Sequence, residues 1–329
     1  MKRIPLLSLL LCWNGLQAQD LYFNQYLKSA VYTNPAFCGS ATGEDGRAAG
    51  RLTSLYRNQW GRDAAYRSTF FSFDQRINGQ AGALGGYVIY DAAGPTGYRS
   101  TQINAVYSYN LPLNHRNQTL QFGFTTGYRS QGIALARMRF EDQIDYSKGV
   151  VRPSAEPLRV DQVENIDLGA GVALFTEKFQ LGLAMHNITR PLFDYTGILD
   201  NRIPRRYTLH GGYNLRLPTA DRRDYAACRF KAVAVRQGPF SQFNASTELV
   251  RNGFGFSLGY RRNWYRISQA DAIILHAQAA HKEYVFFYSF ENTVSSLRNS
   301  IPATHEIGLQ IRFRPIRYSP RPEGPGMFE

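Results

Sequence analysis

The chain has 329 residues, a formal net charge of +13, 14% aromatic residues, 29 glycines and a mean hydropathy of -0.36. Its three cysteines exclude a disulfide framework, and no basic helix or aromatic-basic RNA motif accompanies the positive charge. The composition indicates one large domain of many strands and tight turns, whose charge suits an anionic partner other than nucleic acid.

Residues 1–18 are typical of a secretory signal peptide. Lys2 and Arg3 give a positive start, residues 4–11 form an apolar core, and Leu16-Gln17-Ala18 resembles a cleavage site. An apolar run this short does not span a membrane as a helix, which needs roughly 20 residues. We therefore predict cleavage before Gln19.

Residues 19–47 precede the first predicted strand and form a periplasmic or lumenal N-terminal segment. Proline biases the residue before it away from helix, so Asn34-Pro35 is an extended or turn dipeptide, and Gly39-Ser40 then bends the chain. Two interpretations stay open for residues 22–37. They form an ordinary turn leading into the first strand, or they pack inside the barrel predicted below or against a periplasmic partner.

An alternation of apolar and polar residues with a period of two runs through most of residues 48–314. From Leu120 to Tyr128 the even positions are mainly apolar or aromatic, while the odd positions are polar or glycine. Successive side chains of a strand point to opposite faces, so such strands have one apolar face. Alternation and turn signals together give about 14 strands. We predict an all-β, transmembrane, antiparallel up-and-down β-barrel.

The connections between strands distinguish this barrel from a soluble β-sandwich, which would also alternate. Short and long connections alternate along the chain, so in an up-and-down barrel the long ones share one end. Short connections are predicted at 78–79, 176–178, 251–253 and 281–283, and long ones at 133–164, 190–203, 261–268 and 293–303. Outer-membrane barrels have long extracellular loops and short periplasmic turns, and an even strand count predicts both termini in the periplasm.

Aromatic residues and glycines have predicted directions in this barrel. Tyrosines near strand ends are expected to form outward girdles at the membrane interfaces, and inward glycines leave room for curvature or a close-packed plug. The tyrosines are Tyr87, Tyr90, Tyr98, Tyr107, Tyr109 and Tyr128. The glycines expected to face inward are Gly82, Gly123, Gly169, Gly171, Gly182, Gly255 and Gly259.

The tail after the last strand, residues 315–329, is rich in proline and arginine. Spaced prolines predict an extended, flexible periplasmic segment. It is either a disordered end or part of a basic handle for a periplasmic ring or a peptidoglycan-binding partner. The arginines of that handle would be Arg314, Arg317 and Arg321.

No pattern in the sequence indicates catalysis, a metal or another cofactor. The six histidines lack metal-ligand spacing. His305 and Glu306 are neighbours in a predicted strand, so their side chains face opposite sides and do not converge on one substrate. A hydrogen-bonding role at the barrel rim explains this pair better. We therefore predict a protein that is not an enzyme.

Several short motifs occur in a recognisable order. The N-terminal segment contains Gln19-Asp20, Phe23-Asn24-Gln25-Tyr26, Asn34-Pro35-Ala36-Phe37 and Gly39-Ser40. After it come Tyr56-Arg57-Asn58-Gln59-Trp60, Thr69, Asp74, Asp91 and Gly94, and finally Phe290, Leu297 and His305-Glu306-Ile307. Together they resemble the PorP/SprF family of outer-membrane proteins in the type IX secretion system of Bacteroidota. The resemblance covers essentially the whole mature chain, although Cys38 replaces a usual small residue.

The resemblance implies a barrel that supports type IX export or the attachment of exported adhesins at the cell surface. The residues it marks for structural or partner-binding roles are Tyr26, Asn34, Pro35, Gly39, Arg57, Gln59, Trp60, His305 and Glu306. Its implied partners are a secreted substrate or adhesin, bound by its terminal domain, other translocon components, and the periplasmic ring or motor. An open porin for small solutes is the alternative function.

Arginines in or beside the predicted loops are further candidates. They suit binding of an acidic adhesin or of lipopolysaccharide in the surrounding outer-membrane lipid, and a solvated rim explains them equally well. They are Arg190, Arg202, Arg205, Arg206, Arg261, Arg262 and Arg266.

Overall fold

The computed structural model describes residues 20–42, 50–61, 66–77, 81–94, 97–114, 118–134, 138, 140–145, 147, 149–154, 161–195, 200–219, 224–265, 267–294 and 302–313. The predicted signal peptide, Arg266 and the arginines of the predicted basic handle lie outside these residues.

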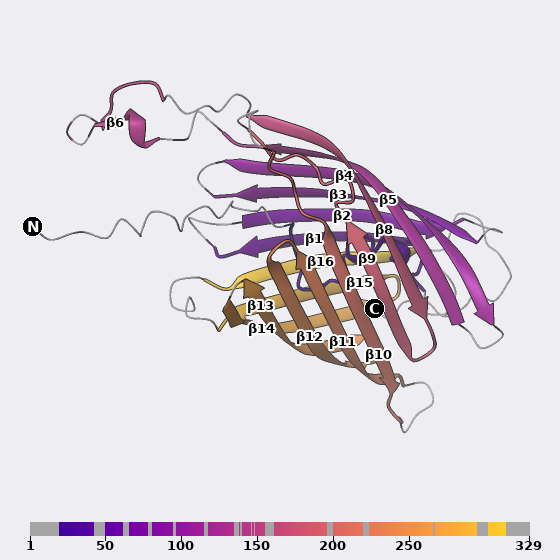
Figure 1. The fold of residues 1–329 in the computed structure, drawn as a ribbon. Helices are drawn as coiled ribbons and strands as arrows, with labels where there is room; N and C mark the ends of the chain where they lie inside the picture. Colours follow the sequence, from indigo (N-terminus) through magenta and orange to yellow (C-terminus); the bar gives the residue numbers. More distant parts are fainter. Residues whose placement is uncertain are drawn as a thin grey trace, which may run out of the picture.

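Fourteen strands of the described chain form one closed antiparallel barrel, which confirms the predicted fold (Figure 1). Its first strand pairs with its last, so the barrel leaves no open edge and its backbone amides are bonded within the wall. The strands are β1 (Gly50–Gln59), β2 (Tyr66–Arg76), β3 (Gly82–Ala93), β4 (Tyr98–Asn114), β5 (Gln118–Gly132), β8 (Gln162–Phe175), β9 (Phe179–His186), β10 (Arg206–Arg216), β11 (Ala226–Gln237), β12 (Phe240–Arg251), β13 (Phe254–Tyr265), β14 (Ile267–His281), β15 (Tyr284–Thr293) and β16 (Thr304–Phe313).

The remaining described elements are short. A two-stranded sheet, β6 (Ile144–Asp145) with β7 (Gly149–Val150), lies in the β5–β8 connection, which also contains the 3-10 helix η3 (Glu141–Gln143). Helix α1 (Ala30–Thr33) and the 3-10 helix η1 (Pro35–Phe37) precede β1. Among the described residues, no helix is both long and apolar enough to cross a membrane.

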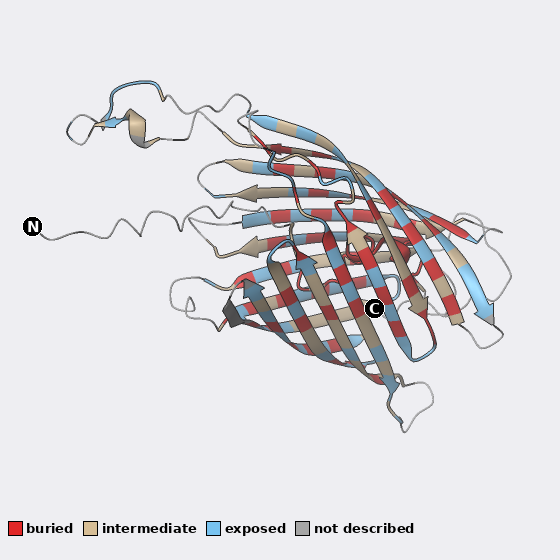
Figure 2. Cartoon of the chain, viewed as in Figure 1, coloured by how far each residue is buried: buried red, intermediate tan, exposed pale blue. Residues whose placement is uncertain are grey.

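The period-two pattern of the sequence produces the two faces of the wall (Figure 2). On β4, Ile103 and Tyr107 are exposed on the outer face, whereas Gln102 and Ser108 are buried on the inner face. A lipid-facing surface therefore carries apolar side chains while the lumen collects polar ones.

Three predicted directions are wrong. Tyr98 shares the inner face of β4 with Gln102, and its hydroxyl accepts a 2.9 Å bond from the buried Gln131 instead of joining an outer girdle. Tyr87 is buried inside the barrel, where it packs against Tyr32, instead of joining an outer girdle. Gly82 lies directly opposite the outward Tyr109 in the β3–β4 pair. Because opposed residues of an antiparallel pair share a face, Gly82 faces outward.

The barrel has two distinct ends. The turn end carries the short connections 176–178, 251–253 and 281–283, together with the start of β1 and the end of β16, and the loop end carries the long β5–β8, β9–β10 and β15–β16 connections. The long connection predicted at 261–268 is wrong, because β13 and β14 remain paired as far as Tyr265 and Ile267.

Candidate functional site

Residues 20–42, called the lumen segment from here on, lie inside the barrel (Figures 1 and 2). From Phe23 to Ala41 every residue except Gln25 is buried. The segment contains α1 and η1, and η1 contacts β4, β5 and β8. The lumen segment is therefore a packed plug rather than an arm outside the barrel.

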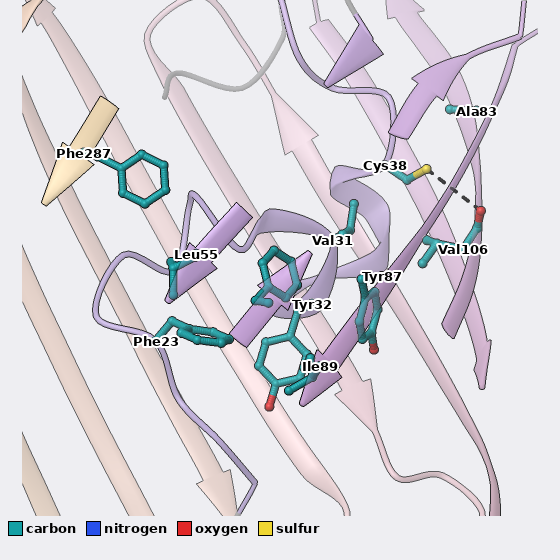
Figure 3. Packing of buried hydrophobic residues seen from close by; sticks show 11 residues of the cluster. Phe23, Val31, Tyr32, Cys38, Leu55, Ala83, Tyr87, Ile89, Val106 and Phe287 are labelled. Atoms are coloured by element: carbon teal, nitrogen blue, oxygen red, sulfur yellow. Dashed lines mark hydrogen bonds between the residues drawn. The ribbon is translucent and has the colours of Figure 1, made fainter. Parts of the chain in front are cut away.

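One side of the lumen segment packs through aromatic rings against the inner wall (Figure 3). The ring centroid of Phe23 lies 5.5 Å from that of Phe70, and the Tyr32 ring lies 5.7 Å from Tyr87 in an edge-to-face arrangement. Offset and edge-to-face pairs add to the free energy gained from burial. These contacts explain why inward aromatic residues replace the polar side chains typical of a water-filled barrel.

Glycines on the inner wall make room for the turn that Asn34 begins. A Cβ on Gly123 would lie 2.2 Å from the Ala36 nitrogen, and one on Gly171 would lie 2.0 Å from Asn34 Oδ1. Asn34 Oδ1 accepts a 2.9 Å bond from the Ala36 N–H, and Asn34 Nδ2 donates to the carbonyl of Val172 at 3.1 Å. The predicted room for a close-packed plug is thus found at these glycines.

Toward the turn end, the lumen segment is held by buried ionic hydrogen bonds. The backbone N–H of Gly39 donates to Asp74 at 2.7 Å, and Arg51 pairs with the same carboxylate at 2.9 Å. Arg51 also donates to the carbonyl of Phe37 at 3.1 Å. Gly39 has a φ of +70°, a conformation that glycine adopts without strain.

A buried cluster of charges holds the part of the lumen segment near Asn24. Arg57 forms ion pairs with Glu306 and, at 3.4 Å, with Glu291, which also pairs with Arg261. The Asn24 N–H donates to Glu306 at 2.9 Å, and its side-chain amide donates to Glu291 at 2.6 Å. Buried charges are tolerated when paired and hydrogen-bonded in this way.

At the loop end, Asp20 is held by basic and amide side chains. Its carboxylate accepts bonds from Arg129 at 2.8 Å and from Asn187 at 2.6 Å, and its backbone N–H donates to Gln237 at 2.9 Å. Burial by itself would raise the pKa of Asp20, but Arg129 and Arg206 outweigh it and hold that pKa at about 2. The carboxylate is therefore charged at neutral pH.

The described part of the lumen segment runs between the two ends of the barrel. Gly50 and Phe313 are paired at the turn end, as the even strand count requires. Asp20, however, bonds Gln237, the last residue of β11, at the loop end. From Asp20 near the loop end, the described residues run through the lumen toward the turn end, where β1 begins, a course that strand counting does not reveal.

Little space is left between the lumen segment and the wall. Three cavities that border it have volumes of about 10, 20 and 30 Å³. A water molecule needs roughly 10–15 Å³ by this measure, so none of these cavities has room for more than about two or three water molecules. Protein atoms therefore fill this part of the lumen.

Most residues marked by the family resemblance meet inside the barrel. Asn34, Pro35 and Gly39 lie in the lumen segment with Tyr26, whose hydroxyl donates to the carbonyl of Ala232 at 3.2 Å. Arg57 and Glu306 form the ion pair described above, and Gln59 accepts a 3.2 Å bond from Arg57. Glu306 is fully buried, so the rim interpretation is wrong for it.

Two of the marked residues lie elsewhere. Trp60 directly follows β1 at the loop end with a φ of 63°, and its ring centroid lies 5.4 Å from that of Tyr66. His305 is exposed on the outer face, where its Nδ1 lies 2.7 Å from the hydroxyl of Tyr288. The neighbours His305 and Glu306 therefore face opposite sides, as their positions in one strand require.

Two of the arginines assigned to the loops are inside the barrel instead. Arg206 stacks 4.3 Å from the Tyr32 ring and bonds the Tyr32 carbonyl, and Arg261 pairs with Glu291. Sequence reasoning also missed Asp20 as a site residue. For Arg206 and Arg261 a signal was available in the sequence, because charged residues on the polar face of a membrane strand must face the lumen.

The fold and its filled lumen define a class: this is a transmembrane β-barrel of the outer-membrane type whose lumen is plugged by its own N-terminal segment. Among the described residues, no group of three or more His, Cys, Asp or Glu side chains is placed to hold a metal ion. The described cysteines, Cys38 and Cys228, are both unpaired.

The chain belongs to the PorP/SprF family of type IX secretion system membrane proteins, whose model matches residues 15–311. This confirms the resemblance inferred from the motifs and makes the protein an outer-membrane component of that system. No curated protein matches the chain.

Solved structures that resemble the chain are distant in sequence. The CymD monoaromatic hydrocarbon channel is 11% identical with a TM-score of 0.51, over 90% of this chain and 95% of the channel. A TodX monoaromatic hydrocarbon channel mutant is 10% identical with a TM-score of 0.46, over 87% and 94%. Omp33 of Acinetobacter baumannii is 9% identical with a TM-score of 0.43, over 81% and 98%. At these identities, the likeness to CymD concerns the fold alone.

Proposed function

We propose that this protein is a non-enzymatic scaffold of the type IX secretion system, which supports export or surface anchoring of secreted proteins by binding them at its loop end. The observation that carries the proposal is the filled lumen. A barrel whose interior is occupied by a buried, ion-paired segment is suited to present surfaces at its two ends, and it offers small solutes no water-filled path through that region. The filled lumen therefore supports a scaffold over an open porin.

The β5–β8 connection supplies the surface that we propose for the secreted partner's terminal domain. Ile144, Val150 and Val151 are each about half exposed there, at 50%, 54% and 50%. Figure 1 shows β6 beyond the ends of the barrel strands, away from the wall. Apolar side chains gathered on such a projecting sheet favour contact with another protein. In the proposed orientation, the loop end is extracellular and the turn end faces the periplasmic ring or motor. Arg314, Arg317 and Arg321 remain a proposed basic handle on that side.

The proposal is tested by export from cells that carry the double variant Ile144→Asp and Val150→Asp. We expect the secreted partner at the cell surface to fall by about tenfold, because buried apolar anchors dominate interface energies. Arg152→Lys in the same connection is the matched control and should export normally. Barrel levels are checked by the change in gel mobility on heating. Undiminished surface display with normal barrel levels would overturn this role for the loop.

A further inference from the structure

Four arginines line a groove of about 620 Å³ at the loop end of the barrel. Arg190, Arg202 and Arg205 come from the β9–β10 connection, and Arg236 comes from β11. Residues distant in the sequence thus bring several guanidinium groups to one depression. Tyr207 also lines it and lies directly opposite Arg236 in the β10–β11 pair.

The groove is on the outer wall and not in the lumen. Arg206 and Gln237 are opposed in the same strand pair, and both are buried inside the barrel. Their chain neighbours Arg205, Tyr207 and Arg236 therefore face outward, because strand side chains alternate. All three are exposed, with Tyr207 47% exposed.

The positive charge of the groove is largely uncompensated. Arg202 pairs with Asp200 at 2.7 Å, and Arg205 Nε donates to the carbonyl of Ile188 at 3.3 Å. In the described part of the chain, neither Arg205 nor Arg236 has a carboxylate partner. A guanidinium group presents a fixed fork of donors that matches the oxygens of a phosphate. The groove is therefore complementary to a phosphate-bearing ligand.

Apolar side chains continue from the groove down the outer wall. Leu209 follows Tyr207 on the same face of β10, opposite Leu183 of β9, and these leucines are 51% and 52% exposed. A tyrosine between arginines and leucines is typical of a membrane interface. A ligand that fits both parts has a phosphate head adjoining acyl chains, which free phosphate lacks.

We infer that this groove binds the phosphate groups of a glycolipid of lipid A chemistry in the outer leaflet, with the acyl chains lying along Leu209 and Leu183. The choice of leaflet rests on the orientation in the proposed function, in which the loop end is extracellular. Such a lipid would fix the depth of the loop end in the membrane next to the β9–β10 connection.

Native mass spectrometry of the purified barrel in detergent tests the inference, with lipid A titrated as the probe. The test variant is Arg205→Gln with Arg236→Gln. The matched control is Arg67→Gln with Arg99→Gln, two exposed outward arginines near the same end but outside the groove. We expect about tenfold weaker lipid A binding for each groove arginine removed and little change in the control, because each loses a charged hydrogen bond.

Several outcomes would overturn the inference. Equal losses in test and control variants would indicate diffuse charge attraction instead of a site. Equal binding of phosphatidylglycerol and lipid A would show a headgroup site without preference for the outer-leaflet glycolipid. Displacement of lipid A by millimolar inorganic phosphate would favour a free-phosphate site. Because the assay uses purified protein, its failure is distinguishable from a failure of the export test.

Discussion

Arg57 on β1 and Glu306 on β16 lie directly opposite each other in the strand pair that closes the barrel, and they form a buried ion pair inside it. Glu306 also accepts the backbone N–H of Asn24 in the lumen segment at 2.9 Å. The Glu306 carboxylate thus bonds both to Arg57, across the β1–β16 pair that closes the barrel, and to the lumen segment. We expect a change at Glu306 to weaken the closure and the attachment of the lumen segment together.

Removing this carboxylate should destabilise the barrel strongly. We expect Glu306→Gln to lower the free energy of unfolding by about 3 kcal/mol, because it leaves buried arginine charge poorly compensated. Urea unfolding in detergent measures this. His305→Gln, on the outer face of the same strand, is the matched control and should stay within about 0.5 kcal/mol of the wild type. Equal effects of both variants would contradict the proposed importance of the inward pair.

Gly123 should be intolerant of any side chain. A Cβ there would lie 2.2 Å from the backbone of the lumen segment, so we expect Gly123→Ala to displace η1 at a cost of about 1–3 kcal/mol. Limited proteolysis of the folded barrel would report this as cleavage within residues 20–42. Gly211→Ala is the control, since the nearest atom to its added Cβ is 3.6 Å away. Protection of the segment in both variants would refute the close approach.

Asp20 should give the stability a pH dependence. Because its pKa is lowered from 3.8 to about 2, its charge contributes about 2 kcal/mol that is fully present above pH 3.8 and lost as pH falls toward 2. The stability difference between the wild type and Asp20→Asn should therefore be constant from pH 7 to about 5 and shrink below about pH 4.

Unfolding midpoints measured at several pH values give this difference. Asp200→Asn removes an ion pair in which Asp200 is 75% exposed, and it should change stability by less than about 1 kcal/mol at every pH. A constant difference for Asp20→Asn down to pH 2 would show that its charge is not the anchor.

The course of the lumen segment predicts where the mature N-terminus emerges. An epitope inserted immediately before Asp20 should be reached by antibody on intact cells, because Asp20 is at the loop end. An epitope at Ser147 in the β5–β8 connection reports the orientation of that end, and one after Phe313 should require permeabilised cells. An epitope before Asp20 that is hidden while the one at Ser147 is exposed would contradict the direction of the segment.

Local patterns were sufficient to predict the barrel and its strand count. Alternation in β4, β5 and β16 depends only on which residues meet lipid, and this is visible in a single strand. The predicted side-chain directions were wrong where protein, and not water, fills the lumen. Tyr87 faces inward because Tyr32 is there to receive it, and that partner is 55 positions earlier in the chain.

The candidate site was harder to predict for the same reason. Arg57 and Glu306 were identified through family motifs, but nothing in the sequence shows that they pair across the barrel closure. Asp20 and Arg129 are 109 positions apart, and Arg261 lay in a predicted loop. Their meeting depends on the N-terminal segment folding back into the lumen, which no periodicity records.

Conductance in planar lipid bilayers tests the sealed lumen most directly. We expect the wild-type barrel to give no steady ionic current, and a variant lacking residues 20–42 to conduct, because a barrel of this strand number is wide enough to hold water once emptied. Gly123→Ala serves if the deletion does not fold. Steady current through the wild-type barrel would contradict a plugged scaffold and favour a porin.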